Sequence, residues 1–179
     1  LAINGWAIES RIYAEDPYRG FLPSIGRLSR YLPPQEGSVG AAIVRNDAGV
    51  REGDEISMFY DPMISKLSTW APDRLAAIDA MGRALEDFHI EGPGHNIPFL
   101  AAVMDQERFR SGALSTSYIK DEFPDGFGGT EPTSFQADLL AAVACAMHRK
   151  ITARSAPQLV RDEWIVIIGP DQRRVKLSN

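Results

Sequence analysis

The stretch IESRIYAEDP, residues 8–17, places an arginine among carboxylates in a segment that reads as a β-strand. Because strand side chains alternate between two faces, Arg11 shares one face with Glu9 and Glu15, while the opposite face is mainly apolar. A guanidinium stays charged and binds carboxylate-like anions through paired hydrogen bonds. The residues alone leave two interpretations open. One is a surface ion-pair network worth under about 1 kcal/mol, the commoner case, and the other is an arginine held in place for a ligand.

Other catalytic patterns are missing from the sequence. There is no P-loop, no G-x-G-x-x-G motif opening a helix after a strand, and no G-x-S-x-G element. The three histidines have no metal-ligand spacing relative to Cys145 or the acids, so we predict no metal site. The single cysteine cannot form an internal disulfide, which fits a reducing compartment.

The composition limits the classes of partner. A net charge of −5 and a pI near 5.2, with scattered basic residues, argue against a nucleic-acid partner. No apolar run approaches the roughly 18 residues of a membrane span, so no membrane partner is expected. The first residue is Leu1 rather than methionine, and we expect a fragment or the ordered part of a longer subunit.

The elements that must position the arginine read as an α+β domain, with strands first and helices after them. Extended segments are expected at the start of the chain, over 27–31, over 42–45 and on both sides of Asp61–Pro62. Helices are expected over 73–88, where apolar residues recur at steps of three and four, and over 96–110 and 115–123.

A second region follows a linker rich in glycine and proline over residues 123–133. Thr133 and Gln136 have capping-box spacing and predict a helix through about Lys150. An apolar stripe is predicted along this helix, made of Phe135, Leu139, Leu140, Val143, Ala146 and Met147. We expect Cys145 and Met147 to be core residues rather than reactive ones.

The chain ends in a predicted hairpin with a turn over 169–172. Both of its faces are apolar, because alternation points one set of large side chains to each face: Trp164, Val166 and Ile168, and then Ile165 and Ile167. A lone hairpin is only marginally stable in water. We therefore expect this last domain to be incomplete here, or completed by a partner.

Five separated motifs resemble the C-terminal subdomain of biotin carboxylase, in the order and at the spacing of that family over residues 5–120. The motifs are GWAIESRIYAEDP, FLPSIGRL, YDPMISKL, DRLAAIDAMGRALEDFHIEGPGHNIPFL and FRSGALSTSYI. This resemblance implies an antiparallel sheet with packed helices.

The next segment, DEFPDGF, resembles the α-subunit family of propionyl-CoA carboxylases. In that family a domain joining the biotin carboxylase and biotin carrier parts binds the β subunit, and it consists of a long helix surrounded by an antiparallel β-barrel. The resemblance implies a biotin carboxylase C-terminal subdomain over 1–122, the linker over 123–133, and the start of the subunit-binding domain over 134–179.

The reaction implied by the resemblance has two halves. Biotin carboxylase uses ATP, Mg²⁺ and bicarbonate to carboxylate biotin on a carrier domain, and the carboxyltransferase β subunit passes the carboxyl group to propionyl-CoA, giving methylmalonyl-CoA. The ATP-binding domain and the biotinylated carrier domain are not in this sequence, so we expect no activity from the chain alone. The implied location is the bacterial cytoplasm or the mitochondrial matrix.

The resemblance also implies roles for single residues. Arg11 matches the family arginine that stabilises charge on the ureido oxygen of biotin and holds bicarbonate, and Glu9 and Glu15 are then expected to hold Arg11. Asp61 lies in a segment that lines the biotin side of the site, and Arg45 matches an arginine near the subunit interface and the biotin pocket of single-function biotin carboxylases.

Two alternatives stay open. The chain could belong to another biotin-dependent acyl-CoA or pyruvate carboxylase, or it could be a non-catalytic assembly module that uses this fold for docking. A docking module would tolerate Arg11→Lys, whereas lysine cannot reproduce the planar guanidinium that the catalytic role needs. Lys66 is expected to be structural, with its stem along the sheet and its ammonium group in water.

Overall fold

The computed structural model describes residues 2–57 and 59–178. The chain divides into two compact units, Leu1–Gly129 and Thr130–Asn179, and the division falls within the predicted linker. Within the described residues, no helix is long and apolar enough to cross a membrane.

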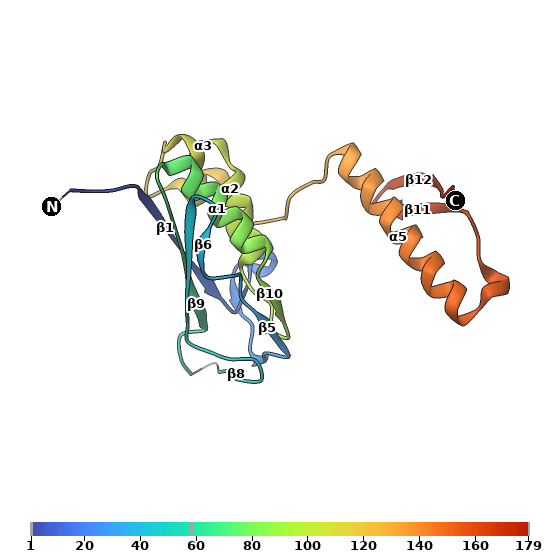
Figure 1. Cartoon of the computed structure of the whole chain (residues 1–179), viewed down its shortest axis with the longest axis horizontal. Helices are drawn as coiled ribbons and strands as arrows, with labels where there is room; N and C mark the ends of the chain where they lie inside the picture. The colour runs from blue at the N-terminus through green and yellow to red at the C-terminus, as the bar shows by residue number, and fades with distance from the viewer. Residues whose placement is uncertain (1, 58, 179) are drawn as a thin grey trace. The chain divides into compact units, whose positions relative to one another are not determined.

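The first unit is built on a four-stranded antiparallel sheet (Figure 1). In spatial order its strands are β1 (Trp6–Tyr13), β9 (Met63–Ala71), β7 (Ala42–Ala48) and β6 (Gly37–Val39). β1 is therefore an edge strand, and β9 separates it from β7. The predicted alternation of β1 is confirmed, because Ser10 and Ile12 are buried while Glu9 and Arg11 are exposed.

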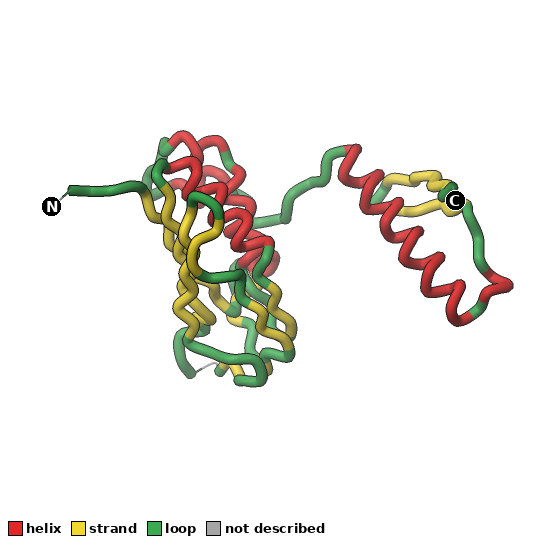
Figure 2. The backbone as a smooth tube through the Cα atoms, in the orientation of Figure 1, coloured by secondary structure: helices red, strands yellow, loops and turns green. Residues whose placement is uncertain are grey.

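Three short strand pairs extend the unit below this sheet (Figure 2). They are β2 (Glu15–Asp16) with β3 (Leu22–Pro23), β4 (Gly26–Arg27) with β8 (Glu55–Ile56), and β5 (Arg30–Leu32) with β10 (His89–Glu91). The prediction of one continuous strand over 27–31 is wrong. Arg27 pairs with β8, the residues from Arg30 pair with β10, and Leu28 between them is fully buried. Pro17 opens the 3₁₀ helix η1 (Pro17–Arg19), which ends the strand region as predicted.

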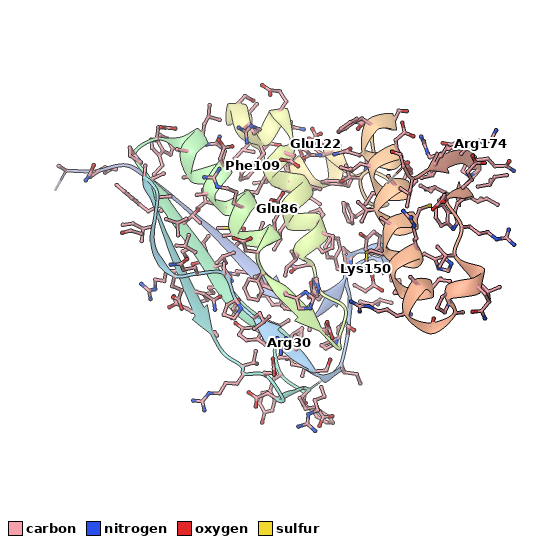
Figure 3. The ribbon with its side chains drawn as sticks, turned by 45° about the vertical axis from the view of Figure 1, so that its right-hand side comes forward. Arg30, Glu86, Phe109, Glu122, Lys150 and Arg174 are labelled. Atoms are coloured by element: carbon pink, nitrogen blue, oxygen red, sulfur yellow. The ribbon has the colours of Figure 1, made fainter. Side chains whose placement is uncertain are left out.

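Helix α1 (Arg74–Glu86) begins where the sequence predicts, because the Asp73 side chain accepts a hydrogen bond from the backbone N–H of Ala76. The helix predicted over 96–110 is instead two helices, α2 (Ile97–Asp105) and α3 (Glu107–Ser111), because Gln106 adopts an extended backbone. α4 (Tyr118–Glu122) follows. Figure 3 shows Phe109 on α3 and Glu122 on α4 at one end of the unit, with Arg30 at the other end.

The core of the first unit lies between α1 and one face of the sheet. Helix α1 packs against β1, β9 and β7. The large side chains with essentially no exposed surface come from these elements and from the loop at Leu28: Ile12, Leu28, Ile64, Leu67, Ile78, Met81 and Leu85. Burial of such side chains is the main stabilising contribution to a fold of this kind.

The second unit consists of one long helix and a hairpin (Figure 1). Helix α5 (Ser134–Ser155) begins with the predicted capping box between Thr133 and Gln136 and extends beyond its predicted end. The hairpin strands β11 (Glu163–Ile168) and β12 (Asp171–Lys176) pair antiparallel, and a 3₁₀ helix η2 (Pro157–Leu159) precedes them. The turn is tighter than predicted, because β12 already begins at Asp171.

The predicted apolar stripe of this helix is not buried within the chain. Phe135, Leu140 and Met147 are 76%, 60% and 60% exposed, so the expectation that Met147 is a core residue is wrong. The buried face of α5 consists of Ala137, Ala141 and Cys145, which confirms the core position of Cys145. The two strands of the hairpin cover only one side of a helix, and that side carries the small residues.

Candidate functional site

The face of the sheet opposite α1, which we call the open face, brings together the polar side chains of three strands. The strand register places Arg11 of β1 opposite Lys66 of β9, and Lys66 opposite Asp47 of β7. In the next row Glu9, Ser68 and Arg45 lie side by side. Residues directly opposite each other on neighbouring strands point to the same face. The predicted site residues Arg11, Glu9 and Arg45 therefore share one surface.

Arg11 is held by its own strand. Its Nε donates a hydrogen bond to Glu9 Oε1 at 3.1 Å, and its side chain is 57% exposed. Hydrogen bonds with Glu9 and then Tyr13 raise the pKa of Arg11 above its ordinary value, so the guanidinium stays charged. Because Glu9 engages the Nε edge, the terminal nitrogens are left with no carboxylate partner among the described residues.

Arg45 repeats this arrangement two strands away. Its Nε donates to Asp47 Oδ1 at 2.9 Å, and the hydrogen bond to Asp47 raises the pKa of Arg45. Its side chain is 71% exposed. The open face thus carries two arginines, each held at Nε by an acid two residues away on the same strand.

Glu15 does not take the place that the sequence predicts for it. It makes no hydrogen bond or ion pair with Arg11 in the part of the chain that the structure describes, because the β1 register shifts between Ile12 and Tyr13 and Glu15 pairs with β3 instead. Burial and then the charge of Asp61 raise the pKa of the Glu15 carboxyl. The structure therefore brings Glu15 near Asp61, another predicted site residue, rather than near Arg11.

Asn96 fastens the edge of the strand that carries Arg11, and sequence reasoning missed it. Its side-chain Oδ1 accepts a hydrogen bond from the Tyr13 N–H at 3.0 Å, and its Nδ2 donates to the Arg11 carbonyl at 3.1 Å. Its backbone N–H donates to the Tyr13 carbonyl at 3.2 Å. These contacts satisfy the free edge of β1 on both sides of the register shift. The local sequence indicated only a helix start at Asn96, and no signal there points to a strand more than 80 residues away.

A largely apolar cavity of about 470 Å³ lies beside the edge of β1 that carries Arg11. Its walls come from β1 and from α2 to α4, and they include Ile8, Val103, Met104, Leu114, Tyr118 and Ile119. Glu9 and Arg11 also line it, so a charged pair meets an apolar surface there.

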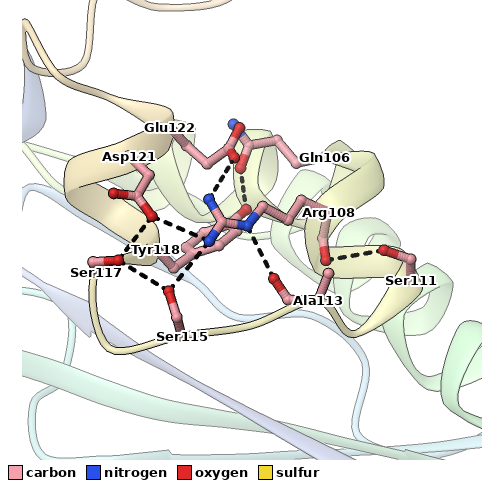
Figure 4. Close-up of polar contacts among 9 residues, drawn as sticks. All are labelled: Gln106, Arg108, Ser111, Ala113, Ser115, Ser117, Tyr118, Asp121 and Glu122. Atoms are coloured by element: carbon pink, nitrogen blue, oxygen red, sulfur yellow. Dashed lines mark hydrogen bonds and ion pairs between the residues drawn. The ribbon is translucent and has the colours of Figure 1, made fainter.

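The wall formed by the loop between α3 and α4 is fastened by Arg108 (Figure 4). Arg108 forms ion pairs with Asp121 and Glu122, both at 3.1 Å, and donates to the Ala113 carbonyl at 2.9 Å. A hydrogen bond from Ser117 and then one from Arg108 lower the pKa of Asp121. The loop is thereby tied to both helices that flank it.

The described residues also limit which ligands this part of the chain can hold. Residues 2–57 and 59–178 contain no group of three or more His, Cys, Asp and Glu side chains that could bind a metal ion. The exposed guanidinium of Arg11 can bind an anion, or an oxygen atom that gains negative charge.

Comparison with known proteins assigns the class. The sequence profile of the biotin carboxylase C-terminal domain matches residues 9–121. The chain therefore belongs to the biotin carboxylase C-terminal domain family, which confirms the predicted resemblance.

The most informative relatives are propionyl-CoA carboxylase α chains. The chain is 50% identical to that of Ruegeria pomeroyi, over 94% of this chain and 28% of the relative. It is 42% identical to the mitochondrial α chain of Homo sapiens, over 99% of this chain and 24% of the relative. The chain thus spans about a quarter of the length of these curated relatives.

Solved structures show the same fold. The biotin carboxylase domain of a thermophilic 2-oxoglutarate carboxylase bound to bicarbonate matches with a TM-score of 0.63 and 41% identity, over 68% of this chain and 26% of that one. The biotin carboxylase subunit of a pyruvate carboxylase matches with a TM-score of 0.65 and 37% identity, over 73% of this chain and 28% of that one. These matches confirm the predicted α+β class.

Proposed function

We propose that this chain is part of the α subunit of a propionyl-CoA carboxylase. That subunit uses ATP and bicarbonate to carboxylate carrier-bound biotin, and a carboxyltransferase β subunit then transfers the carboxyl group to propionyl-CoA, giving methylmalonyl-CoA. The identities of 50% and 42% to α chains of this enzyme support the proposal. The observation that carries it is Arg11, a permanently charged side chain that is 57% exposed and is held at Nε by Glu9.

The proposed role of Arg11 is electrostatic. Biotin supplies a ureido nitrogen that accepts the carboxyl group, and that nitrogen is a poor nucleophile until negative charge can develop on the ureido oxygen. The terminal N–H groups of Arg11 can donate to that oxygen, or to bicarbonate, through charge-assisted hydrogen bonds. Glu9 orients the guanidinium, and Asn96 holds the backbone of Arg11 through its carbonyl. Asp61 and Arg45 are proposed to contact the biotin side.

ATP and Mg²⁺ are proposed to bind elsewhere in the whole subunit. The described residues offer no cluster of acids for a metal ion, and the basic groups on the open face are suited to bicarbonate and biotin. We expect the 179-residue chain to show no bicarbonate-dependent ATP turnover by itself.

The second unit has a proposed role in assembly. Its helix exposes Phe135, Leu139 and Leu140, and the outer face of its hairpin exposes Ile165 and Ile167. Soluble proteins seldom leave so many large apolar side chains together in water, so further strands and a β subunit are the proposed cover. The matching α chains come from bacteria and mitochondria, and we propose the corresponding compartments, the bacterial cytoplasm or the mitochondrial matrix.

The experiment that tests this function is a substrate comparison with the full-length subunit, its biotinylated carrier domain and its β subunit. Fixation of labelled bicarbonate is measured with propionyl-CoA, 3-methylcrotonyl-CoA and pyruvate. We expect propionyl-CoA to be carboxylated at least about tenfold faster than the others, a difference of about 1.4 kcal/mol in transition-state binding. Preference for 3-methylcrotonyl-CoA or pyruvate would assign the chain to a different biotin-dependent carboxylase. Absence of fixation with all three would favour a docking module.

A further inference from the structure

Lys66 occupies the centre of the open face, between the two arginine–acid pairs. It lies on the central strand β9, directly opposite Arg11 on one side and Asp47 on the other. Asp47 is engaged by Arg45, and Glu9 is engaged by Arg11. Lys66 itself makes no hydrogen bond or ion pair with any residue that the structure describes, although its side chain is only partly exposed.

This arrangement has an electrostatic cost when no ligand is bound. Like charges directly opposite each other on neighbouring strands destabilise a sheet, and Arg11 and Lys66 form such a pair. Two acids, Asp47 and Glu36, act on Arg45, whereas Glu9 is the ion-pair partner of Arg11. An anion between Arg11 and Lys66 would turn their repulsion into two attractions.

We propose that Lys66 and Arg11 together bind one oxyanion on the open face of the sheet. The guanidinium contributes its terminal N–H groups, because its Nε–H already donates a hydrogen bond to Glu9. The ammonium group contributes up to three donors from the neighbouring strand. Lys66 is then a ligand-binding residue and not merely a structural one.

The oxyanion belongs to the carboxylate and phosphate class, and both bicarbonate and the phosphate groups of a nucleotide share this chemistry. The choice of bicarbonate rests on the function proposed above for Arg11. Binding of an oxyanion by Lys66 does not depend on turnover, so the two proposals can fail separately.

The test is a titration of the 179-residue chain followed by ¹H–¹⁵N NMR at constant ionic strength. Sodium bicarbonate and inorganic phosphate are added in separate series, and the amide signals of 9–12 and 65–67 report binding. Lys66→Met is compared with Lys66→Arg, and with Lys120→Met as the matched control, because Lys120 is exposed on α4 away from the sheet. Lys66→Gln is a second variant if Lys66→Met does not fold.

We expect saturable shifts in the unaltered chain and binding weakened at least about fivefold in Lys66→Met, because a charge-assisted contact is lost. Lys66→Arg and Lys120→Met should bind within about twofold of the unaltered chain. Tighter binding of bicarbonate assigns the site to the reactant, and tighter binding of phosphate assigns it to a phosphate group.

Absence of saturable shifts, or unchanged binding in Lys66→Met, would overturn the anion site and leave the proposed carboxylase function standing. Conversely, suppose that the full-length enzyme binds the anion through Lys66 but has no carboxylase activity. That result would overturn the proposed function and leave the anion site standing.

Discussion

The two units of this chain differ in where they place their large apolar side chains. The first unit buries Leu67 and Met81 completely between α1 and the sheet. The second unit buries only alanines and a cysteine on α5 and leaves Phe135 76% and Ile165 71% exposed. The first unit therefore has a core of large apolar side chains, whereas large apolar side chains of the second unit are exposed.

The largest expected effect is on the free energy of unfolding. It appears when a leucine of the first unit is compared with a leucine of the second unit. Leu67→Ala should destabilise the first unit by about 2–5 kcal/mol, because it leaves a cavity in a packed core. Leu140→Ala should change the second unit by less than about 0.5 kcal/mol, because Leu140 is already 60% exposed. Amide hydrogen exchange reports each unit separately. A similar loss in both units would mean that the stripe of α5 is buried in the chain alone.

The next effect concerns the residue that fastens the edge of β1. Asn96→Ala removes the partners of the Tyr13 N–H and the Arg11 carbonyl, and we expect a loss of about 1–3 kcal/mol in stability. In the full-length subunit, turnover at saturating ATP should fall more than the KM for ATP changes. Asn46→Ala is the control, because Asn46 donates to the Tyr31 hydroxyl on another element. Unchanged turnover in a folded Asn96→Ala variant would remove Asn96 from the site.

A smaller effect is expected for Arg108, whose ion pairs are partly exposed. Arg108→Met should lower the free energy of unfolding by less than Asn96→Ala does, measured in urea near pH 7. Because the folded-state pKa of Asp121 is lowered, its stabilising contribution is present above its ordinary pKa and is lost as the pH falls through the folded value. The difference between Arg108→Met and the unaltered chain should therefore shrink in acid. Arg51→Met, an exposed arginine without an ion pair among the described residues, is the control.

The smallest effect concerns Glu15, whose folded-state pKa is raised by burial and by Asp61. Its contribution to stability is fully present below its ordinary pKa and is lost as the pH rises through the folded value. Glu15→Gln should therefore raise the Tm at pH 7 and have little effect near pH 4. A lower Tm at pH 7 would show that Glu15 has an attractive charge partner, as the sequence-based interpretation with Arg11 expected.

Local signals allowed several elements of both units to be predicted from sequence. The start of α1 at Asp73 and the capping box at Thr133 each depend on residues within one helical turn, so their patterns are readable. The alternation of β1 is likewise a property of consecutive residues.

The parts that failed depend on contacts between distant residues. Periodicity predicted an apolar stripe on α5. The hairpin instead covers the face with the small residues Ala137, Ala141 and Cys145, which periodicity does not indicate. Asn96 lies against β1, and Lys66 lies between Arg11 and Asp47, because of pairings between residues far apart in the chain, which no short stretch encodes. The register shift between Ile12 and Tyr13 separates Glu15 from Arg11, and this shift also depends on strand pairing rather than on a local signal.

The most direct measurement is bicarbonate-dependent ATP turnover by the full-length subunit carrying Arg11→Lys. Arg30→Lys is the matched control, because Arg30 also lies near an acid, Glu52, but on the β5–β10 pair. If Arg11 stabilises developing charge, kcat should fall by about 100-fold or more in Arg11→Lys while the KM for ATP changes less than about twofold. Arg30→Lys should leave both values unchanged. Near-normal turnover by Arg11→Lys would contradict a catalytic open face and leave this fold as an assembly module.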